Sequence, residues 1–300
     1  MKVSGFTVAR QAVSLGYPLV ESIRSLLPLV DEYIVGVGDA DDGTWEAVAA
    51  IGDPRVKMFR STWELSPRGG RVISEETNKA LARCTGMWGV YLQADEVLHE
   101  RGLPLLRAYL ERYCDSTVEA LAFRYHHFYG SFAFEQDEPL RWYRRATRAI
   151  KLGRGIRSIG DGCAFEVADD RGRRPVAPAH IPVWIYHYGW VRPPELMLAK
   201  NKGFDRLYHD EAWLAGNRRY PDNMQDVYHE RGNLRRFRGE HPAVMRERAA
   251  AADWPFDPDL ERQPPEWIRR PYVYSRWIAR LTVNWLRTRL KDRSPHTTGA

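Results

Sequence analysis

The chain has 300 residues, of which 44% are hydrophobic and 28% are charged. These proportions are typical of soluble globular proteins and exclude a disordered, collagen-like or low-complexity chain. Lys and Arg total 45 against 39 Asp and Glu, a formal net charge of +6, which favours anionic partners. The three cysteines, Cys84, Cys114 and Cys163, are widely spaced and form no CxxC pattern. They predict reduced thiols in the cytoplasm and no zinc site.

The apolar segments are too short to predict membrane insertion. Arg10 and Gln11 interrupt the first apolar run before the core of a secretory signal is complete. The most apolar stretch, residues 25–37, contains Pro28, Asp31 and Glu32 and falls short of the roughly 20 apolar residues of a spanning helix. We therefore expect neither a secretory signal nor a membrane-spanning helix.

The first hundred residues alternate short apolar runs with helical patterns. Strands are predicted at 2–8, 33–37, 55–59 and 88–93, and helices at 17–29, 44–51, 74–84 and 103–113. This rhythm predicts an α/β fold: a Rossmann-like nucleotide-binding, mostly parallel sheet flanked by helices. Ligands of such sheets bind beyond the carboxyl ends of the strands. We therefore seek the site at residues 7–10, 38–42, 62–71 and 95–96.

The pattern changes in the second hundred residues. Strands are predicted at 118–125, 141–151, 164–167 and 182–187, around an aromatic and polar stretch at 126–137, which indicates a mixed sheet. From Pro193 onward the sequence is helical, Arg-rich and interrupted by prolines. We therefore predict one domain at residues 1–192, with halves at 1–100 and 101–192, and a helical, basic extension at residues 193–300.

Two acidic turns follow predicted strands. Asp39 to Thr44 fits either a turn with a helix cap or a carboxylate that accepts hydrogen bonds from a base or a ribose. Asp95-Glu96 fits either an exposed helix start or ligands of Mg²⁺ or Mn²⁺. Because the carboxyl ends of parallel strands share one edge, the position favours the binding interpretation.

Taken in order, these residues resemble a family-2 glycosyltransferase with the type A glycosyltransferase fold. The matching pieces lie within about the first hundred residues and are the opening strand with Gly5-Phe6-Thr7, Asp42-Gly43-Thr44, Asn78, Thr85-Gly86 and Tyr91 to Glu96. The later His187-Tyr188-Gly189-Trp190 is similar to a bacterial subgroup. The resemblance implies a nucleotide-sugar donor, a divalent metal (Mn²⁺ or Mg²⁺) on its diphosphate, and inverting transfer to a glycan or lipid-linked acceptor.

Both acidic turns depart from the family pattern. Val37 and Gly38 stand where two acids are usual, and Asp39 lies one place later. The usual Asp-Ala-Asp-Asp is replaced by Gln93-Ala94-Asp95-Glu96, so that Asp95 keeps the position that implies metal contact. Gln93 then becomes a neutral hydrogen-bond donor to the sugar.

Further side chains complete the expected donor site. The resemblance assigns Thr7 and Asn78 to the nucleotide-sugar, together with Asp39 and Gln93. Arg71, after two glycines, is expected to meet phosphate oxygens, unless it belongs to a solvated loop. His187 is assigned to the metal or the diphosphate, and its alternative is a structural histidine among aromatic residues.

Inverting transfer also needs a general base near the acceptor hydroxyl. We predict Asp161, because the flanking Gly160 and Gly162 allow close approach of a substrate, although Gly-Asp-Gly is equally a plain turn. Asp137 is the alternative base.

The C-terminal residues 272–293 predict a basic amphipathic helix that either contacts the inner face of the membrane or docks on the core. Two other functions remain open at this level. One is a transferase-like protein that binds nucleotide without turnover, prompted by Gln93 and Gly38. The other is a basic nucleic-acid-binding protein, but no RNA or DNA module is recognisable, so we expect no nucleic-acid partner.

Overall fold

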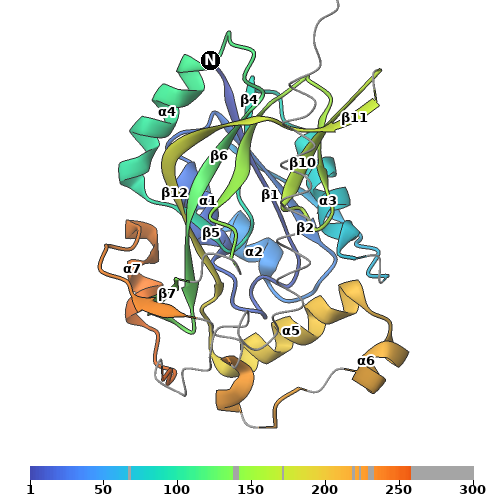
Figure 1. Ribbon diagram of the computed structural model, residues 1–300, viewed down its shortest axis with the longest axis vertical. Helices are drawn as coiled ribbons and strands as arrows, with labels where there is room; N and C mark the ends of the chain where they lie inside the picture. The colour runs from blue at the N-terminus through green and yellow to red at the C-terminus, as the bar shows by residue number, and fades with distance from the viewer. Residues whose placement is uncertain are drawn as a thin grey trace, which may run out of the picture. The chain divides into compact units, whose positions relative to one another are not determined.

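A computed structural model describes residues 1–66, 69–137, 142–170, 172–217, 220–222, 224–228 and 233–257, which belong to the unit Met1–Pro258 (Figure 1). The predicted basic helix at 272–293 lies outside the described residues. Within them, no helix is both long enough and apolar enough to span a membrane.

Parallel strands form the N-terminal half of the sheet. β1 (Val3–Ala9) lies between β2 (Glu32–Gly38) and β4 (Trp88–Tyr91), and β3 (Val56–Ser61) pairs with the outer edge of β2. Helices α1 (Leu19–Leu26), α2 (Thr44–Ala49) and α3 (Arg71–Leu81) connect these strands in turn. Every residue of β1 and β2 is buried, as expected for strands that helices or other elements cover on both faces. The predicted βαβ order is therefore confirmed.

The core explains local sequence choices in this half. Helix α1 turns Leu19, Ile23 and Leu26 toward the sheet, and all three are buried in the main hydrophobic cluster. Gly5 of β1 lies beside Tyr33 of β2, where a Cβ atom would stand 2.7 Å from the tyrosine ring. Glycine at this position therefore lets a large aromatic side chain fill the space over the strand.

The second half of the sheet is mixed. β8 (Arg145–Lys151) joins β4 antiparallel, β6 (Ala120–Tyr129) joins β8, β7 (Ser131–Gln136) joins β6, and β13 (Leu234–Arg236) joins β7. β12 (Pro178–Trp190) runs parallel to β6 and antiparallel to β5 (Glu96–Leu98). The expected mixed pairing is confirmed, and the expected sheet flanked by helices is present.

The aromatic stretch at 126–137 was predicted to separate two strands, and this is wrong. It continues β6 and forms β7. The reason is stacking across the strands: the rings of His126 and Trp184 have centroids 4.2 Å apart, and those of Phe128 and Tyr188 are 4.9 Å apart. Ring pairs of this kind add to the burial energy of a β-sheet surface.

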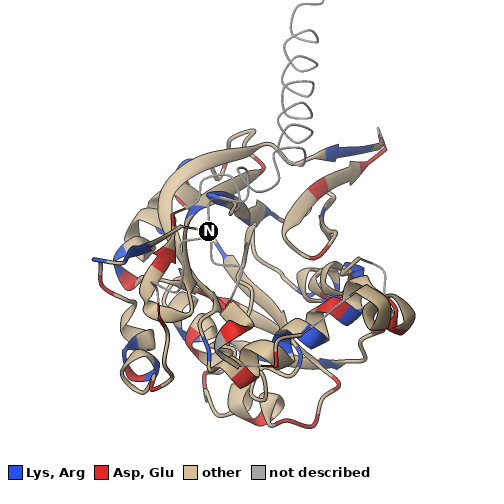
Figure 2. Ribbon diagram, turned by 60° about the horizontal axis from the view of Figure 1, so that its bottom comes forward, with Lys and Arg blue, Asp and Glu red and all other residues tan. Residues whose placement is uncertain are grey.

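The remaining elements surround this sheet. β9 (Ile156–Ile159), β10 (Ala164–Asp169) and β11 (Gly172–Pro175) form a separate antiparallel sheet. The other helical elements are η1 (Glu100–Gly102), α4 (Leu103–Arg112), α5 (Pro194–Tyr208), α6 (Glu211–Asn217), η2 (Met224–Tyr228), η3 (Ala243–Met245) and α7 (Arg246–Ala250). α5 crosses the molecule below the carboxyl ends of the parallel strands (Figure 1). Acidic and basic residues are interspersed over the helices in the view of Figure 2.

Candidate functional site

A cavity of about 580 Å³ lies at the carboxyl ends of β1 and β4, where the parallel sheet predicts a ligand. Val8 and Ala9 of β1 line one side, together with the turn at residues 93–95 that follows β4. α5 forms the opposite wall. Aromatic and polar side chains share the rest of the lining, including Tyr17, Trp63, Tyr91, Trp142, Tyr143, Trp190, Arg10, Gln11 and Arg206.

The two adjacent acids of this turn have different environments. Asp95 lines the cavity, whereas Glu96 is fully buried and accepts two hydrogen bonds from Arg148 of β8, at 2.7 and 2.8 Å. The hydroxyl of Tyr125 donates to Glu96 at 2.8 Å, and the backbone N–H of Gln93 donates at 3.1 Å. Glu96 therefore holds the turn in place, and Asp95 is the carboxylate that faces the cavity.

Asp95 faces His187 of β12, with Oδ2 and Nε2 separated by 3.6 Å. A Cβ atom on Gly189 would stand 2.6 Å from that nitrogen and 2.7 Å from that oxygen, so glycine lets the strand pass close to the pair. Burial raises the pKa of Asp95, but the charges of His187, Lys200 and Arg192 outweigh burial and hold the pKa well below its usual range. Asp95 is therefore an anion at neutral pH.

A second histidine sets the proton position on His187. Nε2 of His127 lies 2.7 Å from the carbonyl oxygen of Tyr143, which only accepts, so this nitrogen carries a proton. Burial and the neighbouring His187 lower the pKa of His127 to about 3, so its Nδ1 is unprotonated. Nδ1 of His187, at 3.0 Å, then donates to it. When His187 is protonated, its Nε2–H and its charge face the Asp95 carboxylate; when His187 is neutral, the lone pair of Nε2 faces Asp95 instead.

This pair of acceptors fits a divalent cation. A nitrogen and an oxygen that bind one ion at about 2.1 Å lie roughly 3 to 4 Å apart, and the observed separation is 3.6 Å. The described part of the chain contains no group of three or more metal-ligating side chains. A cation held by Asp95 and His187 would therefore take its other ligands from a substrate or water, as Mg²⁺ commonly does.

Positive charge surrounds the same turn. Lys200 of α5 lines the cavity and donates to the carbonyl oxygen of Gly189 at 2.5 Å. Burial and the nearby Arg192 lower the pKa of Lys200 to about 7, although Asp95 opposes this shift. Arg192 is buried and donates to Gly189 at 3.1 Å and to the carbonyl of Leu15 at 2.7 Å. These cations offset the charge of Asp95 and suit an anionic ligand.

Two further predicted residues line the same cavity. Gln93 follows β4 and accepts a hydrogen bond from Arg148 at 3.4 Å. Asp161 lies between β9 and β10, where Tyr208 of α5 donates to it at 3.1 Å and the backbone N–H of Cys163 donates at 3.3 Å. The structure thus brings Gln93, Asp161, Asp95 and His187 around one space.

Asp39 and Thr7 lie behind the cavity wall. Asp39 has a half-exposed side chain that accepts from the backbone of Trp63 at 3.1 Å and from Arg10 at 3.4 Å, two residues that line the cavity. The hydrogen bond from Trp63 lowers the pKa of Asp39, burial opposes it, and the charge of Arg10 adds to the lowering. Thr7 is fully buried within β1. Their roles in donor binding stay predictions.

Arg71 and Asn78 belong to α3 and do not line the cavity. Arg71 was expected in a loop, but it is the exposed first residue of the helix, because Gly70 takes the left-handed conformation that starts α3. The amide of Asn78 donates to the carbonyl of Ser158 at 2.9 Å and accepts from its N–H at 2.8 Å. Asn78 therefore ties α3 to β9, and its contact with a donor also stays a prediction.

Several residues that line the cavity were not predicted from the sequence. Gln11 has a φ of 56°, in a region that side chains other than glycine rarely adopt, and its side chain accepts from Arg10 at 2.7 Å. Its position directly after the segment 7–10 was the only available signal. Asn201, Phe204 and Arg206 of α5 reach the cavity through tertiary folding and belong to no motif.

Neither a protein-family model nor a curated protein matches the sequence. Among solved structures, TarS 1–349 of S. aureus in complex with UDP-GlcNAc aligns with a TM-score of 0.41 and 12% identity, over 77% of this chain and 71% of that chain. This chain spans 42% of another TarS structure. Glucosyl-3-phosphoglycerate synthase from Mycobacterium tuberculosis, in complex with Mn²⁺, UDP and phosphoglyceric acid, aligns with a TM-score of 0.31 and 21% identity, over 41% of this chain and 43% of that chain.

Proposed function

We propose that this chain is an inverting glycosyltransferase that moves a sugar from a nucleotide-diphosphate sugar to a hydroxyl acceptor in glycan biosynthesis. One observation carries the proposal: the turn with Gln93 and Asp95, the turn with Asp161 and the strand with His187 are far apart in the sequence and line one cavity at the carboxyl ends of β1 and β4. Parallel α/β sheets bind nucleotides at this edge. The motifs of the first hundred residues resemble the same class of enzyme.

The donor diphosphate is expected beside the Asp95 turn. Asp95 and His187 would hold a divalent cation, Mn²⁺ or Mg²⁺, which supplies charge neutralisation for the departing nucleotide diphosphate. Lys200, whose pKa is about 7, is partly protonated at neutral pH and adds positive charge to the same wall. Arg10 and Arg206 line the cavity with guanidinium groups that suit phosphate oxygens. These cations stabilise negative charge that grows as the sugar leaves.

Asp161 is the proposed general base. Its carboxylate takes the proton of the acceptor hydroxyl as that oxygen bonds to the anomeric carbon, while the nucleotide diphosphate departs from the opposite face of the sugar. Tyr208 orients Asp161 by donating to one of its oxygens. Asp137, the alternative base, lies 3.5 Å from Arg235 and does not line the cavity that holds Asp95 and His187.

We also propose that the enzyme works in the cytoplasm. Cys84, Cys114 and Cys163 are all free thiols, which is the usual state of cysteines in a reducing compartment.

The test is a thermal-shift screen with UDP, GDP, CMP and dTDP, each with and without Mn²⁺, followed by nucleotide release from the matching sugar donors. A ligand at about 100 times its Kd stabilises the folded state by about 2.7 kcal/mol. We expect a metal-dependent shift with one nucleotide and release of that nucleotide from its sugar. Binding without release supports a protein that binds nucleotide without turnover, and no shift with any nucleotide contradicts the proposal.

A further inference from the structure

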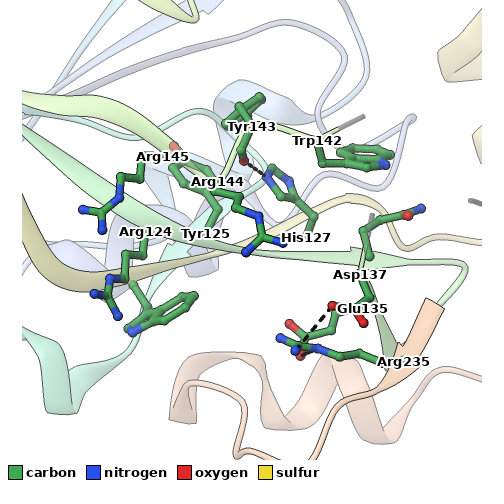
Figure 3. Close-up of a pocket in the computed structure, with 12 residues that line it drawn as sticks. Arg124, Tyr125, His127, Glu135, Asp137, Trp142, Tyr143, Arg144, Arg145 and Arg235 are labelled. Carbon is green, nitrogen blue, oxygen red and sulfur yellow. Dashed lines mark hydrogen bonds and ion pairs between the residues drawn. The ribbon is translucent and has the colours of Figure 1, made fainter. Parts of the chain in front are cut away.

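A second cavity, of about 240 Å³, lies where β6 changes its strand partner (Figure 3). β8 pairs with β6 as far as Arg124 and Arg145, and β7 pairs with it from Phe128 and Glu135. The described strands therefore leave residues 125–127 of this edge unpaired, while β12 follows the other edge. The residues around the gap are Arg124, Tyr125, His127, Glu135, Gln136, Asp137, Trp142, Tyr143, Arg144, Arg145, Trp184 and Arg235.

The acids of this cavity are already engaged. Glu135 accepts from Arg235 at 2.9 Å and pairs with His126 at 2.6 Å. Asp137 lies 3.5 Å from the same Arg235. Figure 3 shows the Glu135–Arg235 pair at one end of the cavity and Arg124 and Arg145 at the other. Arg235 pairs with both acids of the lining, and within the described residues neither acid forms an ion pair with the other three arginines.

Three arginines supply an excess of positive charge. Arg124 and Arg145 stand directly opposite each other on β6 and β8, and Arg144 precedes Arg145. None of the three forms an ion pair with another residue in the described ranges. Like charges opposite each other destabilise an antiparallel strand pair. An anion between the guanidinium groups would remove this repulsion and form charge-assisted hydrogen bonds.

The second cavity adjoins the large one. Trp142 and Tyr143 line both. His127 lines the second cavity and shares a hydrogen bond of 3.0 Å with His187 of the first. The ring of Trp184 lies 5.4 Å from the guanidinium carbon of Arg124. Flat aromatic faces of this kind suit the apolar side of a sugar ring. A saccharide in the second cavity would therefore lie next to the donor site.

We propose that the second cavity binds the acceptor and that Arg124, Arg144 and Arg145 recognise an anionic group on it, the carboxylate or phosphate of an acidic saccharide. Recognition of the anion follows from the cavity alone, and its assignment to an acceptor rests on the proposed function.

The test compares binding of glucuronate, glucose 6-phosphate and glucose to the full chain by titration in NMR, at low and high salt. We expect at least one anionic sugar to bind about tenfold more tightly than glucose, with the difference reduced by salt. Comparison of glucuronate with glucose 6-phosphate identifies whether the cavity prefers a carboxylate or a phosphate. The double variant Arg124→Gln/Arg145→Gln should lose the preference, whereas Arg112→Gln/Arg173→Gln, which removes two exposed arginines elsewhere, should keep it.

Stability separates loss of binding from loss of fold. Without ligand, Arg145→Gln should unfold at the same or a higher temperature than the parent, because it relieves repulsion from Arg124. Equal binding of the three sugars, or a preference that survives the double variant, overturns the proposal. If nucleotides bind and anionic sugars show no preference, the anion site and its assignment to an acceptor both fail, while the transferase stands. If anionic sugars bind and no nucleotide does, the anion site stands and its assignment to an acceptor is overturned together with the transferase.

Discussion

The two cavities occupy the two halves of one sheet and arise from different features of it. The large cavity lies at the ends of parallel strands, where the βαβ connections bring successive loops to one edge. The second cavity lies in the antiparallel half, where β6 changes its strand partner from β8 to β7. The first follows from element order, which a sequence displays. The second depends on strand register, which a single sequence does not display.

The buried pair Glu96–Arg148 links the two halves, and its loss should have the largest effect. Glu96→Gln leaves the guanidinium of Arg148 without a counter-charge in a site with no solvent exposure. Removing one member of such a pair lowers the free energy of unfolding by about 3–5 kcal/mol. Urea denaturation measures this change, with the exposed Glu111→Gln as the control. A loss below about 1 kcal/mol would show that the halves are held together in another way.

Acid should lower the stability of the parallel half of the sheet, because it protonates Glu32 at the start of β2. Burial raises the pKa of Glu32, but hydrogen bonds from Lys57, Ser4 and Thr85 outweigh this and lower it to about 2. Because the folded pKa lies below the unfolded value of about 4.3, this stabilisation is complete above pH 5 and disappears as the pH falls toward 2. It amounts to about 3 kcal/mol.

Unfolding free energies of the parent and Glu32→Gln, measured from pH 7 to pH 2, test this prediction. The parent should be more stable at pH 7, and the two curves should converge in acid. A difference that stays constant with pH would assign the effect to packing.

The large cavity depends on the charge of Asp95. Asp95→Asn should lower nucleotide release by about 100-fold, because it removes the anion that faces His187, and losses of one electrostatic group at a reaction centre have this size. The exposed Asp41→Asn is the matched control. Steady-state release assays at several Mn²⁺ concentrations measure the effect. Activity equal to that of the control would remove Asp95 from the site.

The smallest expected effect on the free energy of unfolding concerns the second cavity. Arg145→Gln should raise the free energy of unfolding of the ligand-free protein by about 0.2–1 kcal/mol, since it ends the repulsion with Arg124 across the strands. Urea midpoints measured at low and high salt separate charge from packing. A stabilisation that high salt leaves unchanged would contradict the charge explanation.

The sequence predicted the parallel half because its elements have clear periods and adjacent order. It also placed Asp95, His187, Gln93 and Asp161 together, through motifs at strand ends and a turn. The resemblance selected Asp95 over Glu96, but the residue pattern alone did not distinguish the two acids. Two neighbouring acids look alike in a sequence, and the distant Arg148 decides which of them is withdrawn from the cavity.

Other misses have similar physical origins. β5, β9 and β13 have three or four residues each, too few to show a period. The end of β6 was hidden because the ring-stacking partners of His126 and Phe128 lie on β12, far along the chain. Phe132 of β7 likewise contacts the ring of Tyr188 on β12. The second cavity could not be predicted for the same reason, since strand register alone brings its arginines together.

Helix α5 connects access to the large cavity with the state of its proposed base. The last turn of α5 is fastened where the N–H of Gly70 donates to the carbonyl of Leu207 at 3.0 Å and where Tyr208 donates to Asp161. A movement of this turn that admits or releases a nucleotide would break both bonds. Within the described residues, such a movement would leave Asp161 held by the backbone N–H of Cys163 alone, so the proposed base is fully oriented only while the last turn of α5 is in place. Under the proposed function, departure of the spent nucleotide is then a separate kinetic step. While the last turn of α5 is displaced, Asp161 is poorly oriented to activate a water molecule against the donor.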